Sequence, residues 1–249
     1  MRFCIFCAAP ASSKEDAWPL WLLRQIGTGM PARIDAERGT QPLPSWRVVG
    51  TGLTVRFVCA PCNNGWMSEL ENRVKPIVLR LLDNASTNLT VEEQTTLATW
   101  SVKNAMVFEA LRIEQPWFFS AGERNAFRES LSPPARTNVW IAKCVDQAGV
   151  YSCATNLSGT VEGSSMRMEA YVTTMGFGAL GIQVVGGKLP AEVPLATTVT
   201  VDQTPGPWDD ATVRIWPGPK QVVNWPPPIG LHGELGLEAF GDRWGPHQD

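Results

Sequence analysis

Two cysteine pairs, Cys4-x-x-Cys7 and Cys59-x-x-Cys62, constrain the fold of this chain more than any other feature of its sequence. A Cys-x-x-Cys turn presents two thiolates side by side. Two such turns complete the tetrahedron of sulfurs that binds a structural zinc ion at about 2.3 Å per sulfur. We therefore predict one zinc site with these four cysteines as ligands. Two disulfides, or four unrelated buried thiols, are the alternative interpretations.

The interval between the two pairs, residues 8–58, is longer than the roughly 15–20 residues usual between zinc knuckles. The entropy lost in closing a loop rises only with the logarithm of its length, so tripling the loop costs on the order of 1 kcal/mol more. Structural zinc contributes roughly 10–16 kcal/mol to the folding of small metal-dependent peptides. The long insertion is thus compatible with a shared site.

Length and composition allow a sizeable hydrophobic core, since the chain has 249 residues of which 44% are hydrophobic. No segment approaches 18 uninterrupted apolar residues, so we expect no membrane span. The first residues lack the apolar core of a secretory signal. We therefore expect a cytoplasmic protein, and the reducing cytoplasm favours metal-bound thiolates over disulfides.

Charge is unevenly distributed along the chain. Residues 1–80 carry ten Lys and Arg against six Asp and Glu, whereas the remainder carries eleven against eighteen. A basic first third is compatible with DNA binding there, although such side chains are also common on ordinary solvated surfaces. The net charge of −3 argues against a general nucleic-acid coat protein. The candidate phosphate contacts are Arg2, Lys14, Arg24, Arg47, Arg56, Arg73 and Lys75.

The predicted fold class is α+β, in four segments. Residues 1–82 form a zinc-stabilised ββα-like module, 83–137 are helical, 138–216 form a mostly antiparallel β-domain, and 217–249 form a proline-rich irregular tail. In the module we expect a short strand and knuckle over 1–10 and a helix over 17–27 that begins near Pro19.

The second knuckle is expected at the end of a β-hairpin formed by residues 46–49 and 53–58. Asn63 or Asn64 would then cap a helix that Pro76 interrupts, because proline removes a hydrogen bond and clashes with the preceding turn.

Two further helices are expected in the middle segment. Thr90-Val91-Glu92-Glu93 is a capping box for a helix to about Ile113, and Ser120-Ala121-Gly122-Glu123 opens a shorter one.

The β-domain should begin with a hairpin of 139–145 and 150–154, with Cys144 and Cys153 on the same face as apolar packers. The further expected strands are 166–173, 180–185, 196–201 and 211–216.

The motifs of the first segment also resemble those of HNH-endonuclease-like proteins of bacteria and their phages. The resemblance is carried by Cys4-x-x-Cys7, by Glu15-Asp16-Ala17-Trp18-Pro19-x-Trp21-Leu22, and by Cys59-x-x-Cys62-Asn63-Asn64-Gly65-Trp66-Met67-Ser68-x-Leu70-Glu71. It covers residues 1–80, and the stretch 100–106 is similar to the helix after the knuckle in that group. The resemblance implies a ββα unit with one catalytic divalent ion, Mg²⁺ or Mn²⁺, and a separate zinc ion that only supports the fold.

The resemblance also implies a set of catalytic residues. In the family, an acidic residue followed by histidine supplies a metal ligand and the general base, and an asparagine and a further polar residue complete the site. Matched by position, Glu15 takes the acidic place, Asp16 that of the histidine and Asn63 that of the asparagine, with Glu69 or Glu71 as the last ligand. The implied activity is metal-dependent hydrolysis of DNA.

Each candidate has a structural interpretation as well. Glu15 and Asp16 can stabilise the positive end of the following helix, Asn63 can act as a helix cap, and Glu69 and Glu71 can be solvated residues of a first helical turn.

The missing histidine is the main departure from the family pattern. His232 and His247 lie in the proline-rich tail, and the module has none. An aspartate is about 2.6 pKa units weaker as a base than an imidazole, which corresponds to roughly 3.5 kcal/mol. A neighbouring carboxylate can raise the pKa of Asp16, and nucleases with only carboxylates act through divalent metals.

The sequence therefore allows an altered or inactive nuclease. The alternative is a non-catalytic protein that binds nucleic acid through the module or a protein partner through the β-rich half, as in phage or defence systems. The third interpretation is a structural protein that zinc stabilises and that does not contact nucleic acid.

Overall fold

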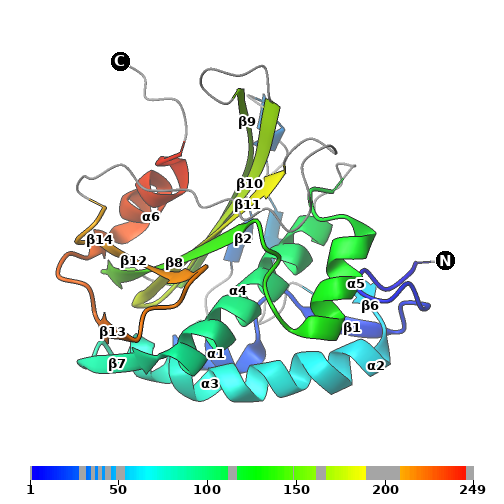
Figure 1. The fold of residues 1–249 in the computed structure, drawn as a ribbon, viewed down its shortest axis with the longest axis horizontal. Helices are drawn as coiled ribbons and strands as arrows, with labels where there is room; N and C mark the ends of the chain where they lie inside the picture. The colour runs from blue at the N-terminus through cyan, green and yellow to red at the C-terminus, as the bar shows by residue number, and fades with distance from the viewer. Residues whose placement is uncertain are drawn as a thin grey trace.

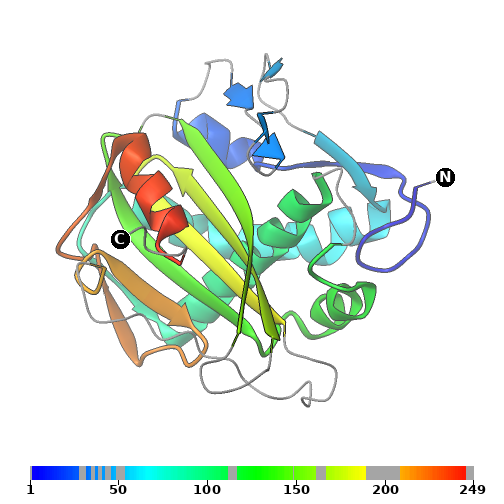
Figure 2. The same cartoon turned by 90° about the horizontal axis from the view of Figure 1, so that it is seen from above.

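The computed structural model describes residues 2–27, 32–34, 37–38, 41–42, 46–48, 54–111, 117–147, 149–160, 167–188 and 208–244. The fold is α+β, as predicted from the sequence. A mostly antiparallel sheet lies between two layers of helices, with α3 and α4 on one face and α6 on the other (Figures 1 and 2). No helix among the described residues is both long and apolar enough to cross a membrane.

The N-terminal part is built on a short two-stranded sheet. Strand β1 (Ser13–Asp16) pairs antiparallel with β6 (Thr54–Val58), and helix α1 (Leu20–Gln25) follows β1 with Pro19 at its N-cap. The first zinc knuckle, the turn that contains Cys4 and Cys7, is closed by two backbone interactions. They are an antiparallel β-bridge between Phe3 and Pro10 and a hydrogen bond from the Cys4 N–H to the Ala9 carbonyl.

The predicted hairpin of residues 46–49 with 53–58 is wrong. Strand β5 (Trp46–Val48) pairs with β2 (Ala32–Ile34), and β6 pairs with β1 instead. The cause is the meeting of the two knuckles, which brings the chain after Cys7 beside the chain before Cys59. Strands β3 (Glu37–Arg38) and β4 (Gln41–Pro42) form a further pair.

The helix after the second knuckle begins earlier and runs further than predicted. It starts with α2 (Ala60–Cys62), passes through a π-helical turn η1 (Asn63–Met67) and continues as α3 (Ser68–Leu82). Cys59 is its N-cap, so neither Asn63 nor Asn64 caps it. Pro76 lies inside α3 without ending it. Proline has no N–H to donate to the Asn72 carbonyl, but both residues are on the exposed side of the helix, where water can bond that carbonyl.

Helix α4 (Val91–Leu111) is the central element of the core. Every residue from Leu97 to Ala110 is buried. The helix follows β7 (Thr87–Thr90), and the predicted capping box is confirmed, since Thr90 and Glu93 bond each other's backbone N–H. The expected end near Ile113 lies outside the described residues. Helix α5 (Ala121–Ser130) begins where predicted, and Ser120 and Glu123 form a capping box at its start.

The main sheet has the order β12-β8-β11-β10-β9, with β14 parallel to β8. Side chains alternate between the α4 face, where Ile141 and Ile182 lie, and the α6 face, where Trp140 and Val185 lie. The strands are β8 (Thr137–Val145), β9 (Val150–Thr160), β10 (Arg167–Phe177), β11 (Leu180–Lys188) and β12 (Thr212–Trp216).

The predicted hairpin of 139–145 with 150–154 is wrong, because β10 and β11 lie between β8 and β9. Strands β10 and β11 form a tight hairpin in the interior of the sheet. The segment that follows β8 passes the turn of this hairpin, where the Gly178 N–H donates to the Gly149 carbonyl. Two strands therefore separate Cys144 from Cys153, and neither residue forms a disulfide. The strand expected at 196–201 lies outside the described residues.

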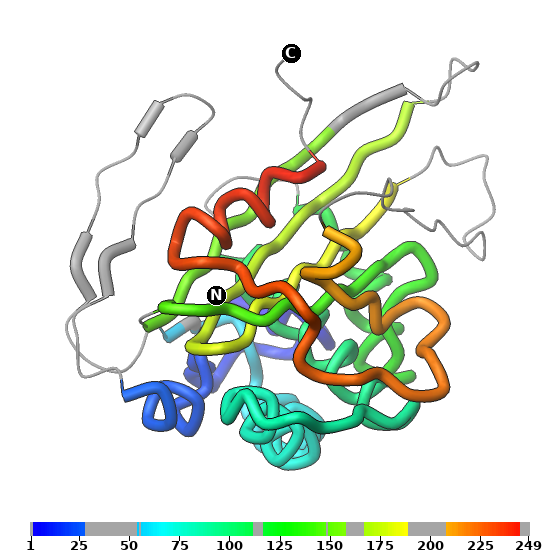
Figure 3. The backbone as a smooth tube through the Cα atoms, turned by 90° about the vertical axis from the view of Figure 1, so that its left-hand side faces the viewer, coloured from blue at the N-terminus to red at the C-terminus, as the bar shows by residue number. Residues whose placement is uncertain are grey.

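The segment after Trp216 is ordered into elements, so the prediction of an irregular tail is wrong. Strand β13 (Val222–Trp225) pairs with β7, and β14 (Leu231–His232) leads into helix α6 (Gly233–Asp242), which runs over the outer face of the sheet (Figure 3). Buried Gln183 of β11 fixes the helix, since its amide donates to the Phe240 carbonyl at 2.6 Å. These elements form because β13 lies between Pro219 and Pro226, and α6 contains no proline.

One core cluster contains residues of the first three predicted segments, from the knuckles through α4 to the sheet, and the β13 residue Trp225. The boundaries of the four predicted domains stay a prediction.

Two glycines of α6 allow a test of how the helix packs. A methyl group at Gly236 would lie 2.9 Å from the Leu231 carbonyl carbon, whereas one at Gly241 would meet nothing closer than Thr174 Oγ1 at 3.5 Å. We expect Gly236→Ala to destabilise the protein by about 1–3 kcal/mol through overpacking against backbone. Gly241→Ala should be neutral or stabilise by up to about 1 kcal/mol, as alanine does in helices. Urea unfolding measures both; equal effects would contradict this packing of α6.

Candidate metal centre and acidic pocket

The four predicted zinc ligands lie together. The Sγ atoms of Cys4, Cys7, Cys59 and Cys62 are all within 4.8 Å of one another. Cys7 Sγ lies 3.5 Å from Cys59 Sγ and 3.6 Å from Cys62 Sγ. Sulfurs bound tetrahedrally at about 2.3 Å are about 3.8 Å apart, so this cysteine cluster has the donor set and dimensions of a structural zinc site. All four thiols are free, which excludes the disulfide alternative in this structure.

The environment of the cysteine cluster is largely apolar. Phe6 packs edge-on against Trp66 with ring centroids 5.0 Å apart, and Trp66 packs in turn on Phe127 of α5. Burial raises the pKa of the Cys59 and Cys62 thiols. Burial acts the same way on Cys7, but hydrogen bonds with the Ala9 backbone and the other thiols outweigh it and lower the pKa. Cys7 therefore ionises more readily than Cys59 and Cys62.

A second site lies beside the cysteine cluster, where β1 meets η1 and the start of α3. It is a solvent-open pocket of about 280 Å³, which we call the acidic pocket. Its lining includes Glu15 and Asp16 from β1, Asn63 from η1 and Glu71 from α3. The fold thus brings the candidates Glu15 and Asp16 together with Asn63 and Glu71, which lie about 50 residues later in the sequence.

The structure also separates the two candidates for the last ligand. Glu71 lines the acidic pocket, and 23% of its side chain is exposed. Glu69 is exposed on α3 and is not among the residues that line the pocket. Residues two apart on a helix point about 200° apart, so only one of them can face a given pocket. Glu69 has no place in the site.

A buried lysine joins two of the pocket's carboxylates. Lys103 of α4 has no exposed side-chain surface, and its Nζ donates to Glu15 Oε1 and to Glu71 Oε1, at 3.1 Å each. A charged ammonium without such partners would be very costly to bury. The sequence analysis did not identify Lys103. The available signal was that Lys103 is the one charged residue between Leu97 and Phe108.

The protonation of these groups follows from their burial and their neighbours. Burial raises the pKa of Glu15 more than the charge of Lys103 lowers it. Burial, and then the charge of Glu71, also raises the pKa of Asp16. For Lys103, burial alone would lower the pKa, but the carboxylates of Glu15 and Glu71 raise it on balance. The raised pKa of Asp16 brings this carboxyl closer to the base strength of a histidine.

Asn63 has a clear structural role. Its Nδ2 donates to Ser13 Oγ at 2.6 Å and to the Lys14 carbonyl at 3.0 Å, so both amide protons connect η1 to β1. The Asn63 carbonyl oxygen has no partner among the described residues and remains available to the pocket that the residue lines. The alternative interpretation of Asn63 as a helix cap is wrong.

The interpretation of Glu15 and Asp16 as helix caps is also wrong. Both residues belong to β1, and α1 has no side-chain cap at its N-terminus. Glu15 is only 7% exposed and is committed to Lys103.

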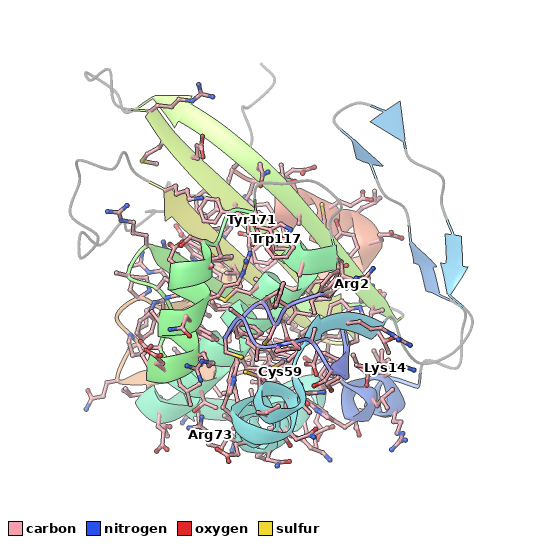
Figure 4. All side chains as sticks on the ribbon, turned by 90° about the vertical axis from the view of Figure 1, so that its right-hand side faces the viewer. Arg2, Lys14, Cys59, Arg73, Trp117 and Tyr171 are labelled. Carbon is pink, nitrogen blue, oxygen red and sulfur yellow. The ribbon has the colours of Figure 1, made fainter. Side chains whose placement is uncertain are left out.

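The predicted phosphate contacts are scattered over the surface of the N-terminal part. Figure 4 shows Lys14 and Arg73 on either side of Cys59 in that view. Lys14 lines the acidic pocket, and Lys75 lies 5.9 Å from the ring of Trp21, another lining residue. The side chain of Arg47 lies outside the described part, and the exposed members of the set are Arg2, Lys14, Arg24, Arg56, Arg73 and Lys75.

His232 takes no part in either site. His232 is exposed at the N-cap of α6, on the far side of the sheet from α4. His247 lies outside the described residues.

Comparison with known proteins gives no further identification. No protein-family model matches the chain, and no curated protein or solved structure matches it either.

Proposed function

We propose that the protein is a divalent-metal-dependent DNA endonuclease of the HNH-like type, in which Asp16 replaces the usual base histidine. The observation that carries the proposal is the convergence of Glu15, Asp16, Asn63 and Glu71 on one solvent-open pocket. Three of these side chains are carboxylates, which are the ligands that Mg²⁺ and Mn²⁺ prefer.

The residues of the acidic pocket have distinct roles in this proposal. A bound Mg²⁺ or Mn²⁺ would supply activation of water and charge neutralisation at the scissile phosphate. Asp16 and Glu71 would hold that ion, and Asp16 would also accept the proton of the attacking water. Glu15 supports them from its buried position beside Lys103, and Asn63 keeps β1 and η1 in register.

The cysteine cluster has a supporting role. We assign zinc to it because a closed set of four thiolates leaves no open coordination position, as in structural zinc sites. The bound ion would fasten the start of α2 to the first knuckle, and so hold β1 against η1 as a ββα-like module. This role requires reduced thiols, which is why we place the protein in the cytoplasm.

DNA would approach over the exposed basic side chains of the module. Lys14 at the pocket and Lys75 beside Trp21 would contact phosphates next to the scissile bond.

Plasmid nicking tests the proposal, with Asp16→His as the decisive variant. The wild-type protein should nick supercoiled plasmid in Mg²⁺ or Mn²⁺, and EDTA should abolish the nicking. Asp16→His restores the stronger base and should raise the rate by about 10-fold. The gain is smaller than the roughly 10²–10⁴-fold of general-base catalysis because Asp16 already serves as a base. Absence of nicking by both proteins in either metal would reject the endonuclease.

A non-catalytic binding protein is the second candidate, and a second pocket favours it. This pocket of about 430 Å³ lies beside the first knuckle and is lined by Phe57, Trp117 and Arg124, with Arg2 lying 5.1 Å from the Phe57 ring centroid. Aromatic faces beside cations are the usual means of stacking single-stranded bases. No nicking, together with a gel shift that weakens steeply with salt, would favour this candidate. A protein partner at the β-rich half stays a prediction.

A further inference from the structure

The pocket beside the first knuckle is a separate site from the acidic pocket, and the two share no lining residue. Its volume of about 430 Å³ falls within the roughly 300–1,000 Å³ of small-molecule sites, and we call it the aromatic pocket. Its lining comes from the first knuckle, from β6 and from the start of α5. Arg2 and Trp117, which both line it, lie above Cys59 in the view of Figure 4.

The walls of the aromatic pocket are mainly rings and aliphatic side chains. Phe57 and Trp117 pack edge-on with their ring centroids 6.4 Å apart, and Phe3 and Ile5 add further apolar surface. Phe3 is 58% exposed, so its ring offers apolar surface that water now covers. Such walls favour a ligand with a flat aromatic body.

Arg124 of α5 supplies a buried cation to this pocket. The residue is only 2% exposed, and of its three nitrogens Nη2 alone donates to a described residue, namely Glu109 at 2.8 Å. Its Nε is fully covered and has no acceptor among the described residues. A buried donor without an acceptor is destabilising, so an acceptor supplied by a ligand would be stabilising here.

A second arginine lies at the same pocket, and each arginine is placed against a ring. The guanidinium carbon of Arg2 is 5.1 Å from the Phe57 ring centroid, and that of Arg124 is 4.4 Å from the Trp117 ring centroid. Arg2 is exposed and forms no ion pair with a described residue. No acidic side chain is among the described residues that line the aromatic pocket.

The start of α5 adds a third group that attracts anions. Ala121, the first residue of this ten-residue helix, lines the pocket, and the capping box bonds the N–H groups of Ser120 and Glu123 but not that of Ala121. Glu123 does not line the pocket, and its Oε2 is committed to Ser120. Guanidinium groups and the N–H groups at a helix start are common ligands of phosphate.

We infer that the aromatic pocket binds a nucleotide by two parts at once, its base against Phe57 and Trp117 and its terminal phosphate on Arg2 and Arg124. A terminal phosphate is favoured over one within a strand because it offers three acceptor oxygens to these donors. The inference does not depend on the chemistry of the acidic pocket, and it goes beyond base stacking by adding a phosphate anchor. A free nucleotide and the phosphorylated end of a strand present the same chemistry.

Isothermal titration calorimetry of the full chain, without added divalent ions, tests the inference. The probes are deoxyadenosine monophosphate and deoxyadenosine, which differ only in the phosphate. The wild-type protein should bind the monophosphate at least about 10-fold more tightly, as expected for hydrogen bonds between charged groups. Arg2→Gln should remove most of this preference. Arg167→Gln removes an exposed arginine of β10 by the same substitution and should leave the preference unchanged.

Arg124→Lys tests the buried cation, because lysine keeps a positive charge for Glu109 but lacks the planar fork. It should weaken binding of the monophosphate by about 10-fold or more and that of deoxyadenosine by less than about twofold. Thermal melting checks its folding, and Arg2→Gln decides the question if Arg124→Lys does not fold. Equal binding of the two probes by the wild-type protein, or binding of neither, would overturn the inference.

A single-stranded oligodeoxyadenylate with and without a terminal phosphate then distinguishes the two sources of the ligand. Tighter binding of the phosphorylated strand supports recognition of a strand end, and equal binding of both strands supports a free nucleotide. The proposed endonuclease is judged separately by plasmid nicking, since these titrations require neither metal nor cleavage.

Discussion

Cys59→Ser is expected to release most of the bound zinc and to unfold the N-terminal part of the chain. Cys59 is both a member of the cysteine cluster and the N-cap of α2. Serine is a poor zinc ligand, and the free energy of zinc binding is folding free energy in such sites, amounting to roughly 10–16 kcal/mol in small peptides. We expect the free energy of unfolding to fall by several kcal/mol, on the order of half that range.

Hydrogen exchange and metal analysis measure this effect. Amides of β1, β6 and α2 should lose protection in Cys59→Ser, and zinc should drop from about one ion per chain. Cys153→Ser is the matched control, because Cys153 lies half-buried on β9, away from the cysteine cluster. It should keep its zinc and change stability by no more than about 0.5–1 kcal/mol. Equal behaviour of the two variants would show that the cysteine cluster holds no structural metal.

Glu71→Gln is expected to reduce plasmid nicking by at least about 100-fold, whereas Glu69→Gln should leave the rate within about twofold of wild type. The two substitutions remove one carboxylate each from neighbouring positions of α3 by an isosteric change. Of these two glutamates, Glu71 lines the acidic pocket and accepts a hydrogen bond from Lys103, whereas Glu69 does neither.

Thermal melting of the same variants separates catalysis from folding. Glu71→Gln loses one of the two ion pairs of Lys103 but keeps the pair with Glu15, so it should stay folded at the assay temperature. Equal nicking by Glu71→Gln and Glu69→Gln would remove the acidic pocket from the mechanism.

The local features of the fold could be predicted from the sequence because they depend on residues close in the chain. The two capping boxes, at Thr90 and Ser120, are satisfied within three residues of their start. The cysteine cluster could be predicted as well, although it joins residues far apart, because few arrangements other than a metal site call for paired Cys-x-x-Cys turns.

The errors concern partners that lie far apart in the sequence. Both predicted hairpins joined strands that are adjacent in the sequence, whereas β6 pairs with β1 and β8 pairs with β11. Hydrophobic alternation gives the buried face of a strand and carries little information on its neighbour. Pro76 inside α3 has a similar cause, since tertiary packing of Val74 and Ile77 outweighs one lost hydrogen bond.

The acidic pocket was partly predictable. The resemblance supplied Glu15, Asp16 and Asn63, but the choice between Glu69 and Glu71 required the direction of each side chain on α3. The sequence shows Lys103 as an isolated charged residue, but not its pairing with Glu15, because the two residues are 88 positions apart in the chain.

Anomalous diffraction from crystals grown in Mn²⁺ tests the central claim most directly, because data at the manganese and zinc edges locate each metal separately. We predict one zinc peak among the Sγ atoms of Cys4, Cys7, Cys59 and Cys62, and one manganese peak within about 2.5 Å of carboxylate oxygens of Asp16 and Glu71. A well-ordered acidic pocket without manganese at saturating Mn²⁺ would contradict the account.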